Sequence, residues 1–206
     1  MRARIAVVTA AAAAVGLSAC GGHLTLDSPP TPGPAPTVAD AGTGHHRIHG
    51  LLAVHDPGEV TGTLTGRCRT RDHGELPDRS CTPGAIDPAV TQANIGSTIC
   101  RSGYTTKVRP PESQTEKFKW DVAEPAYGQH DVPGELDHEI PLELGGANDA
   151  RNLWVEAGPL PNPKDAVENA LNRAVCDGTV KLRAAQAAIA KNWLKAEAAL
   201  GIAGSG

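Results

Sequence analysis

Four cysteines constrain the fold of this chain more than any other feature of its sequence. Only 3% of the 206 residues are aromatic, so a folded domain has few large side chains with which to build an apolar core. Disulfide bonds would offset that deficit, and they form in proteins that leave the reducing cytoplasm. The four residues are Cys68, Cys81, Cys100 and Cys176, and their interpretation depends on the start of the chain.

The start of the chain, residues 1–19, has the pattern of a secretory signal. Arg2 and Arg4 precede an apolar run that is too short and too interrupted for a good membrane span, and small residues come before Cys20. Residues 17–20, Leu-Ser-Ala-Cys, resemble the lipobox of bacterial lipoproteins, in which the cysteine is acylated and becomes the new N-terminus. An ordinary signal peptide with a chance cysteine is the alternative. The resemblance implies a protein of the cell envelope that is lipid-anchored to the membrane through Cys20 and faces outside the cytoplasm.

Export makes disulfides the expected state of the other four cysteines, which are an even set. We expect Cys68 to pair with Cys81, because these two bracket a short polar loop. Cys100 would then pair with Cys176 and tie a helix before the candidate site to one after it. A zinc site is the alternative, but it needs close CxxC-like pairs that the spacing of these cysteines does not supply.

Residues 20–47 are expected to form a disordered tether. They are rich in proline and glycine and have almost nothing to bury. His45, His46 and His49 lie at the end of this region and could bind a metal ion. Histidines in such tracts are more often solvated, so they are left out of the expected site.

The folded part is expected to divide near residue 87. Short apolar runs broken by Asp-Pro-Gly predict a small N-terminal subdomain over residues 48–86, with a hairpin or extended segment over 51–65. Residues 87–200 are expected to form the main domain. Its expected elements are a helix from Asp87 to Ile99, a strand from Tyr104 to Val108, and helices over 163–176 and 180–200, the last with a buried stripe of Leu182, Ile189, Trp193 and Leu194.

The stretch from Glu135 to Trp154 and the helix after it carry the most specific pattern in the chain. The pattern consists of Asp137-His138, Gly145-Gly146, Asn152-Leu153-Trp154, and a helix opened by Asn162-Pro163. This order resembles the signature of HNH nucleases, in which Asp-His ends one strand, a Gly-Gly loop follows, and Asn-Leu-aromatic begins the return strand. The resemblance implies an α+β fold, a small ββα-metal (HNH-type) domain with flanking helices. Each motif alone would also fit a surface pair, an ordinary turn or a strand start.

The resemblance also implies a function, that of a divalent-metal-dependent endonuclease that hydrolyses phosphodiester bonds of DNA or RNA. Asp137 and Asn162 would hold one divalent metal ion (Mg, Mn, Ca, Ni or Zn), which stabilises charge on the phosphate and assists the leaving oxygen. His138 would be the general base, a role that suits a side chain whose ordinary pKa lies near neutrality. Asn152 would fix the loop and orient His138.

The helix ligand is the open point of this assignment. Asn162 is followed by proline at the first helical position, which is also the pattern of a good N-cap. If Asn162 only caps the helix, Asp165 or Asn169 becomes the candidate ligand. The commoner family pattern has a histidine at this helix position, and the two CxxC pairs that hold a structural zinc in many HNH domains are missing here.

The formal net charge of −4 argues mildly against a nucleic-acid partner. Capture of a nucleic acid substrate would depend on basic side chains near the site, which fit a solvated surface equally well. These are Arg109, Arg151, Lys164 and Arg173. The rival interpretation is a catalytically inactive, lipid-anchored envelope protein that uses the HNH scaffold for binding. The intact set of motif residues favours the enzyme.

Overall fold

A computed structural model describes residues 47–204 of the chain. The expected signal peptide, Cys20, the tether up to residue 46, and His45 and His46 lie outside the described residues. None of the helices within residues 47–204 has both the length and the apolar character needed to cross a bilayer.

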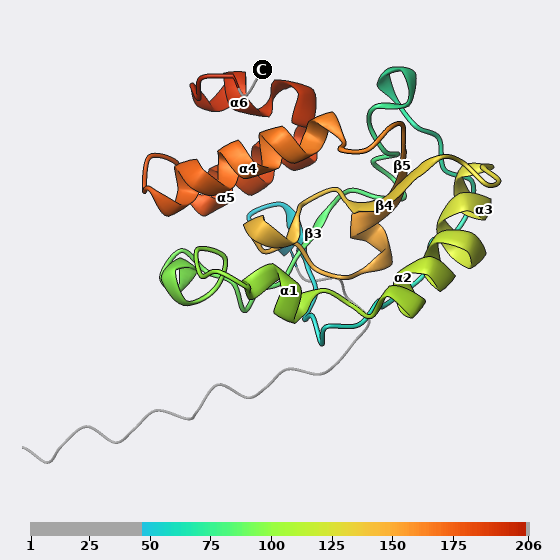
Figure 1. The fold of residues 1–206 in the computed structure, drawn as a ribbon, viewed down its shortest axis with the longest axis horizontal. Helices are drawn as coiled ribbons and strands as arrows, with labels where there is room; N and C mark the ends of the chain where they lie inside the picture. Colours follow the sequence, from blue (N-terminus) through green and yellow to red (C-terminus); the bar gives the residue numbers. More distant parts are fainter. Residues whose placement is uncertain (1–46, 205–206) are drawn as a thin grey trace, which may run out of the picture. The chain divides into compact units, whose positions relative to one another are not determined.

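The described part has mixed α and β structure, so the expected α+β class is confirmed (Figure 1). The strands are β1 Arg47–Ile48, β2 Leu51–Ala53, β3 Ala85–Ile86, β4 Gly134–His138 and β5 Leu153–Ala157. The α-helices are α1 Tyr104–Val108, α2 Glu112–Phe118, α3 Glu124–Tyr127, α4 Pro163–Cys176, α5 Leu182–Lys191 and α6 Ala196–Leu200, and a π-helical turn over Lys119–Ala123 joins α2 to α3.

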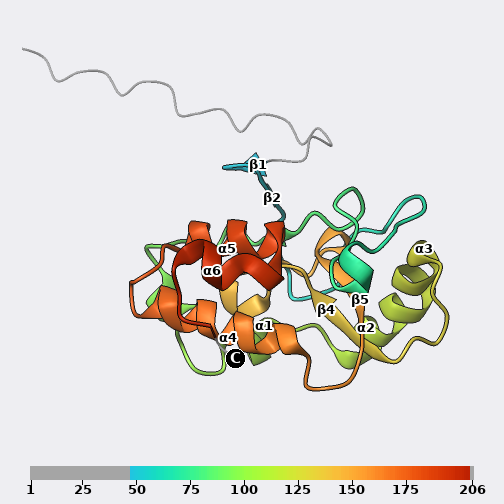
Figure 2. The ribbon, with the colours of Figure 1, turned by 90° about the horizontal axis from the view of Figure 1, so that it is seen from above.

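The site is built around the antiparallel pair of β4 and β5, which α4 follows directly in the chain. In this register Asp137 lies opposite Trp154, and His138 lies opposite Leu153. Helices α4 and α5 lie on one side of this pair, and α2 and α3 lie on the other (Figures 1 and 2). A second sheet joins β1, β2 and β3, with β2 antiparallel to β1 and parallel to β3.

Two apolar clusters hold these elements together. The larger packs α4, α5 and α6 against the loop after β4, and Leu171, Ile189 and Ile140 are buried in it. The smaller packs α2 and the π-helical turn against β5, through Phe118 and Leu153 among others. The candidate site lies at the end of β4, where Asp137 and His138 are paired with β5 and Asp137 contacts the start of α4.

Two disulfide bonds join Cys68 to Cys81 and Cys100 to Cys176, and both expected pairings are confirmed. The second bond ties the segment before α1 to the last residue of α4. Disulfides of this kind indicate an oxidising location outside the cytoplasm.

The helix expected from Asp87 to Ile99 is wrong, because this segment forms turns and one 3₁₀ turn over Ile95–Ser97. The side chain of Asn94 accepts a hydrogen bond from the amide of Thr91 and donates one to the carbonyl of Ala89. These bonds replace the backbone bonds that a helix would need, a competition that is characteristic of asparagine.

The strand expected from Tyr104 to Val108 is also wrong, because these residues form helix α1. They lie between Gly103, which has a φ of +81°, and Arg109, whose extended backbone ends the helix. The β-branched residues in this stretch have no neighbouring strand to pair with, and β-propensity depends on such a neighbour.

The helix expected over 180–200 is interrupted. Asn192 has an extended backbone that separates α5 from α6, and the indole Nε1 of Trp193 donates to the carbonyl oxygen of Glu75 at 2.7 Å. Leu194 consequently turns outward with 44% of its surface exposed, so its place in the buried stripe is wrong. The antiparallel hairpin of the N-terminal segment is formed by β1 and β2 and begins before residue 51.

Candidate active site

The loop after β4 is held in a tight conformation that only glycine permits at residue 146. A Cβ atom at Gly146 would lie 1.7 Å from the carbonyl oxygen of Ile140, which no side chain could tolerate. Gly145 adds a backbone with a φ of +73° that ends the 3₁₀ turn over Leu142–Leu144. The Gly-Gly pair thus lets the chain fold back closely on the end of β4.

Asn152 closes this loop with four hydrogen bonds from a fully buried amide. Its Oδ1 accepts from the backbone amides of Ala85 at 3.1 Å and Ile140 at 2.9 Å. Its Nδ2 donates to the carbonyl oxygens of Ile140 and Ala147, both at 2.9 Å. Asn152 therefore joins β3, the end of β4 and the loop, and its connection to His138 runs through the backbone.

His138 lies at the last position of β4 and is 5% exposed. Its Nε2 is 2.8 Å from Oδ1 of Asn148, a residue that the sequence pattern did not single out. Burial lowers the pKa of the imidazole below its ordinary value, although the bond to Asn148 and the carboxylate of Asp137 oppose that effect. The ring is therefore neutral at physiological pH and able to accept a proton.

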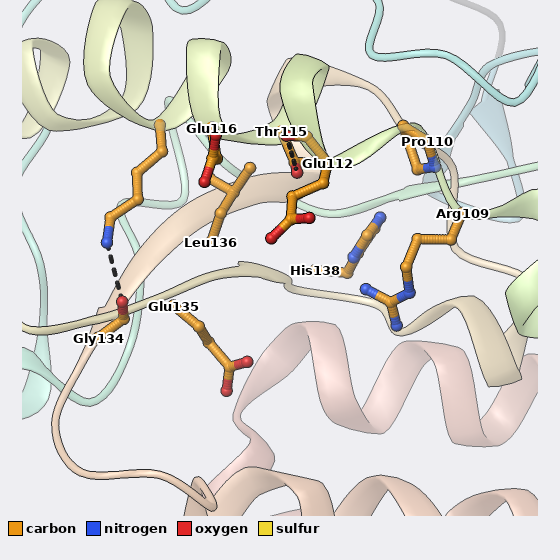
Figure 3. A pocket seen from close by; sticks show the side chains of 10 residues that line it. Arg109, Pro110, Glu112, Thr115, Glu116, Gly134, Glu135, Leu136 and His138 are labelled. Carbon is orange, nitrogen blue, oxygen red and sulfur yellow. Dashed lines mark hydrogen bonds between the residues drawn. The ribbon is translucent and has the colours of Figure 1, made fainter.

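His138 lines a cavity of about 540 Å³ between α2 and β4. Figure 3 shows the side chains of Arg109 and His138 close together at one end of this cavity, with Glu112 and Glu116 projecting from α2. A smaller cavity of about 100 Å³ is lined by Asp137, His138 and Arg109 together. Asp137 and His138 thus reach a common space that Arg109 borders.

Lys164 forms a buried ion pair with Asp137. Its ammonium donates to Oδ2 of Asp137 at 2.6 Å, to the carbonyl oxygen of His138 at 2.7 Å, and to the carboxylate of Glu168. Burial alone would lower the pKa of Lys164, but the neighbouring carboxylates raise it well above its ordinary value. The lysine is therefore charged. The expectation that Lys164 helps to capture a nucleic acid substrate is wrong, because the side chain is only 1% exposed and cannot contact a substrate.

Glu156 and Asn162 complete the group around Asp137. The buried carboxyl of Glu156 lies beside the side chains of Asp137 and Asn162, and burial together with the charge of Asp137 raises its pKa to about 9. Oδ1 of Asn162 accepts from the backbone amide of Lys164 at 3.0 Å, so Asn162 caps α4. The three side chains come from β4, β5 and the start of α4.

The other three basic residues that were expected to capture substrate are Arg109, Arg151 and Arg173. Arg151 forms two hydrogen bonds with the carboxylate of Asp149, at 2.6 and 3.0 Å. Arg173 is exposed on α4, and Asn169, the alternative helix ligand, is exposed on the same helix. Of the four basic residues expected near the site, Arg109 borders both cavities at His138, and Lys119 of the π-helical turn also lines the larger one.

Within residues 47–204, no cluster of three or more histidine, cysteine, aspartate and glutamate side chains has the arrangement of a metal site. Asp137, Glu156 and Asn162 nevertheless offer the oxygen donors that hard divalent cations take. Oε2 of Glu156 is buried and has no hydrogen-bond partner in the described part of the chain. In donor chemistry these three residues fit a divalent cation, which on binding would displace the proton that the raised pKa of Glu156 implies and would compete with the ammonium of Lys164 for Asp137.

Sequence reasoning missed Asn148, Glu156 and Glu168 as members of the site, and it gave Lys164 a role in substrate capture instead of the buried ion pair with Asp137. The spacing of Lys164 and Glu168 carried a signal, because residues four apart lie on one face of a helix. The position of Glu156 also carried a signal. Glu156 lies two residues after Trp154 on β5, so its side chain is on the same face of the strand as that of Trp154, which pairs with Asp137. No comparable pattern marked Asn148.

Comparison of the chain with models of protein families, with curated proteins and with solved structures found no match.

Proposed function

We propose that this domain is a divalent-metal-dependent endonuclease of the HNH type that hydrolyses phosphodiester bonds of DNA or RNA at the cell envelope. The observation that carries the proposal is the pair of neighbouring residues at the end of β4. His138 reaches the cavity as a neutral base, while Asp137 joins the oxygen donors of Glu156 and Asn162. Both residues border the same small cavity.

His138 removes a proton from the attacking water in this proposal. A general base contributes about 10² to 10⁴ to the rate, and it must be neutral at the working pH. Burial meets that condition by lowering the pKa of the imidazole. Asn152 keeps the end of β4 and the loop in register, so the ring stays in its place beside the cavity.

Arg109 supplies positive charge at the cavity. Its guanidinium lies beside His138 (Figure 3) and is suited to bind phosphate oxygens through paired N–H groups. Asp137, Glu156 and Asn162 would hold the cation. When bound, a divalent cation stabilises charge on the phosphate and on the leaving oxygen.

The envelope location rests on two features of the chain. The disulfides fit an oxidising compartment, and the signal-like start with its lipobox-like end supplies an address and an anchor at Cys20. We propose that acylated Cys20 holds the domain at the membrane.

A second candidate function is binding without catalysis on the same scaffold. Two observations favour it: the ammonium of Lys164 already pairs with Asp137, and Glu112, Glu116 and Glu135 bring negative charge to the cavity at His138. Like charges there would weaken the approach of a polyanion.

Plasmid cleavage by the purified protein separates the two candidates. The enzyme nicks and linearises plasmid when Mg²⁺ or Mn²⁺ is added, and excess chelator stops the reaction. Asp137→Ala should weaken metal binding measured by calorimetry, whereas Asp121→Ala on the exposed side of the π-helical turn should leave it unchanged. A protein that is folded, binds no divalent metal and cleaves neither DNA nor RNA is the inactive scaffold.

A further inference from the structure

Two side chains, those of Asp56 and Asn148, connect the N-terminal segment to His138. Oδ2 of Asp56 accepts hydrogen bonds from the backbone amide and from Nδ2 of Asn148, both at 2.9 Å. Nδ2 of Asn148 also donates to the carbonyl oxygen of Val108 at 2.8 Å, and Oδ1 faces Nε2 of His138 at 2.8 Å. Asn148 is buried, so water does not compete for these bonds.

The partners of Asn148 fix which end of its amide is the oxygen. The carboxylate of Asp56 and the carbonyl of Val108 are both acceptors, and both lie at the end that must therefore be the NH₂ group. A flipped amide would set its oxygen against two other oxygens in a buried place, which is unfavourable. Oδ1 is consequently the atom next to His138.

The orientation of Asn148 in turn fixes which ring nitrogen of His138 carries a hydrogen. An amide oxygen only accepts hydrogen bonds, so Nε2 of His138 must carry a hydrogen, and Nδ1 is the ring nitrogen that is left to accept a proton. Among the described residues, the structure shows a side-chain hydrogen bond of this ring at Nε2 alone.

Asp56 is itself held rigidly. Its second oxygen, Oδ1, accepts from the backbone amide of Gly58 at 2.7 Å, within the Asp-Pro-Gly turn. The backbone amide of Thr61 donates to the carbonyl of Asn148 at 2.9 Å. Asp56 and Thr61 of the segment 56–61 thus both form hydrogen bonds with Asn148, the residue that contacts His138.

We propose that Asp56 and Asn148 are positioning residues that hold His138 in its Nε2–H tautomer and leave Nδ1 as the atom that accepts the proton from water. The proposal rests on the proposed hydrolase function for its catalytic part. It also makes residues 56–61 of the N-terminal segment part of the active site of the domain. We call the hydrogen-bonded series Asp56–Asn148–His138 the relay; Asp56 and Asn148 are 92 positions apart in the chain.

The tautomer can be read directly in the purified protein by nuclear magnetic resonance. Long-range ¹H–¹⁵N correlations of a neutral histidine ring show which nitrogen carries the hydrogen, and the signals of His138 are those lost in His138→Ala. We expect the Nε2–H pattern in the wild type. The Nδ1–H pattern there would overturn the proposal, and this measurement needs no nuclease activity.

Variants then test the positioning role. Asn148→Ala should give a mixture of tautomers and lower kcat by about 10²-fold with little change in KM, since it leaves the ring misoriented. Asp56→Asn should lower kcat by about 10-fold, because its amide cannot satisfy three N–H donors. Asp78→Asn is the matched control, since Asp78 likewise accepts from two backbone amides, of Arg69 and Ser80, but has no link to His138.

The outcomes separate this proposal from the function on which it rests. Folded Asn148→Ala and Asp56→Asn proteins that retain the wild-type kcat and the Nε2–H pattern would overturn the relay. A wild type that shows the Nε2–H pattern but cleaves no nucleic acid would overturn the hydrolase function and the catalytic part of the proposal, while the assignment of the proton would stand.

Discussion

Replacement of Lys164 by methionine should destabilise the domain strongly. The ammonium is 1% exposed and bonded to Asp137, Glu168 and the carbonyl of His138, so methionine fills its volume but leaves buried carboxylates without their counter-charge. Removal of one partner of a buried ion pair costs about 3 to 5 kcal/mol. For a domain of this size each kcal/mol lowers Tm by about 2 to 4 °C, so Lys164→Met should melt about 6 to 20 °C below the wild type.

Lys117→Met is the matched control, because Lys117 also pairs with an acid four residues on, Asp121, in a helical segment. The side chain of Lys117 is 77% exposed, and such pairs contribute about 0.3 to 0.5 kcal/mol. Urea unfolding followed by circular dichroism measures both variants. If Lys164→Met unfolds within 1 kcal/mol of Lys117→Met, about the size of an exposed pair, the buried-pair reasoning is refuted. A second change, Glu168→Leu, should recover part of the loss by removing one of the unpaired carboxylates.

Three further predictions concern the anchor, the cross-links and a buried acid. Cys20→Ala should block lipidation, so that the protein leaves the membrane fraction or stays unprocessed; unchanged fractionation and migration would contradict the anchor. Loss of the Cys100–Cys176 bond, whose cysteines lie 76 positions apart, should cost about 4.5 kcal/mol, against about 3 kcal/mol for Cys68–Cys81, separated by 13. Unfolding of the two serine double variants measures this difference, and a larger loss at the shorter loop would count against the loop-entropy argument. Burial raises the pKa of Glu139 from 4.5 to about 8, so the folded state binds more protons than the unfolded state between these values. The free energy of unfolding should therefore fall as pH rises through this window, and less steeply in Glu139→Gln; equal slopes would show that Glu139 does not titrate as its burial implies.

Local signals in the sequence were sufficient for several parts of this fold. The apolar spacing of Val167, Leu171 and Val175 predicted helix α4. Pro163 at its start and the Asp-Gly pair after Cys176 marked its two ends. Both disulfides followed from the spacing of the cysteines and from the expected export.

Other parts depend on contacts that no local pattern contains. A helix after Asp87 was a reasonable expectation from its capping residues, but Asn94 bonds the backbone of Ala89 and Thr91 and prevents it. The break at Asn192 depends on Trp193, whose indole reaches Glu75 across more than half of the folded chain.

The candidate site divides in the same way. Asp137, His138, Asn152 and Asn162 lie within one short stretch, so a motif could predict them together. Their arrangement around Lys164 and Glu156 needed the register of β4 and β5 and the position of α4. The link from Asp56 to Asn148 could not be predicted, because it joins segments that are distant in the sequence and meet only in the folded chain.

The rate of plasmid cleavage by His138→Ala tests the central claim most directly. His130→Ala is the control, since His130 is exposed and does not line the cavity at His138. With matched metal, salt and thermal stability, His138→Ala should cleave about 10² to 10⁴ times more slowly than the wild type, while His130→Ala keeps the wild-type rate. Cleavage by folded His138→Ala at the wild-type rate would show that His138 is not the general base and would contradict the account.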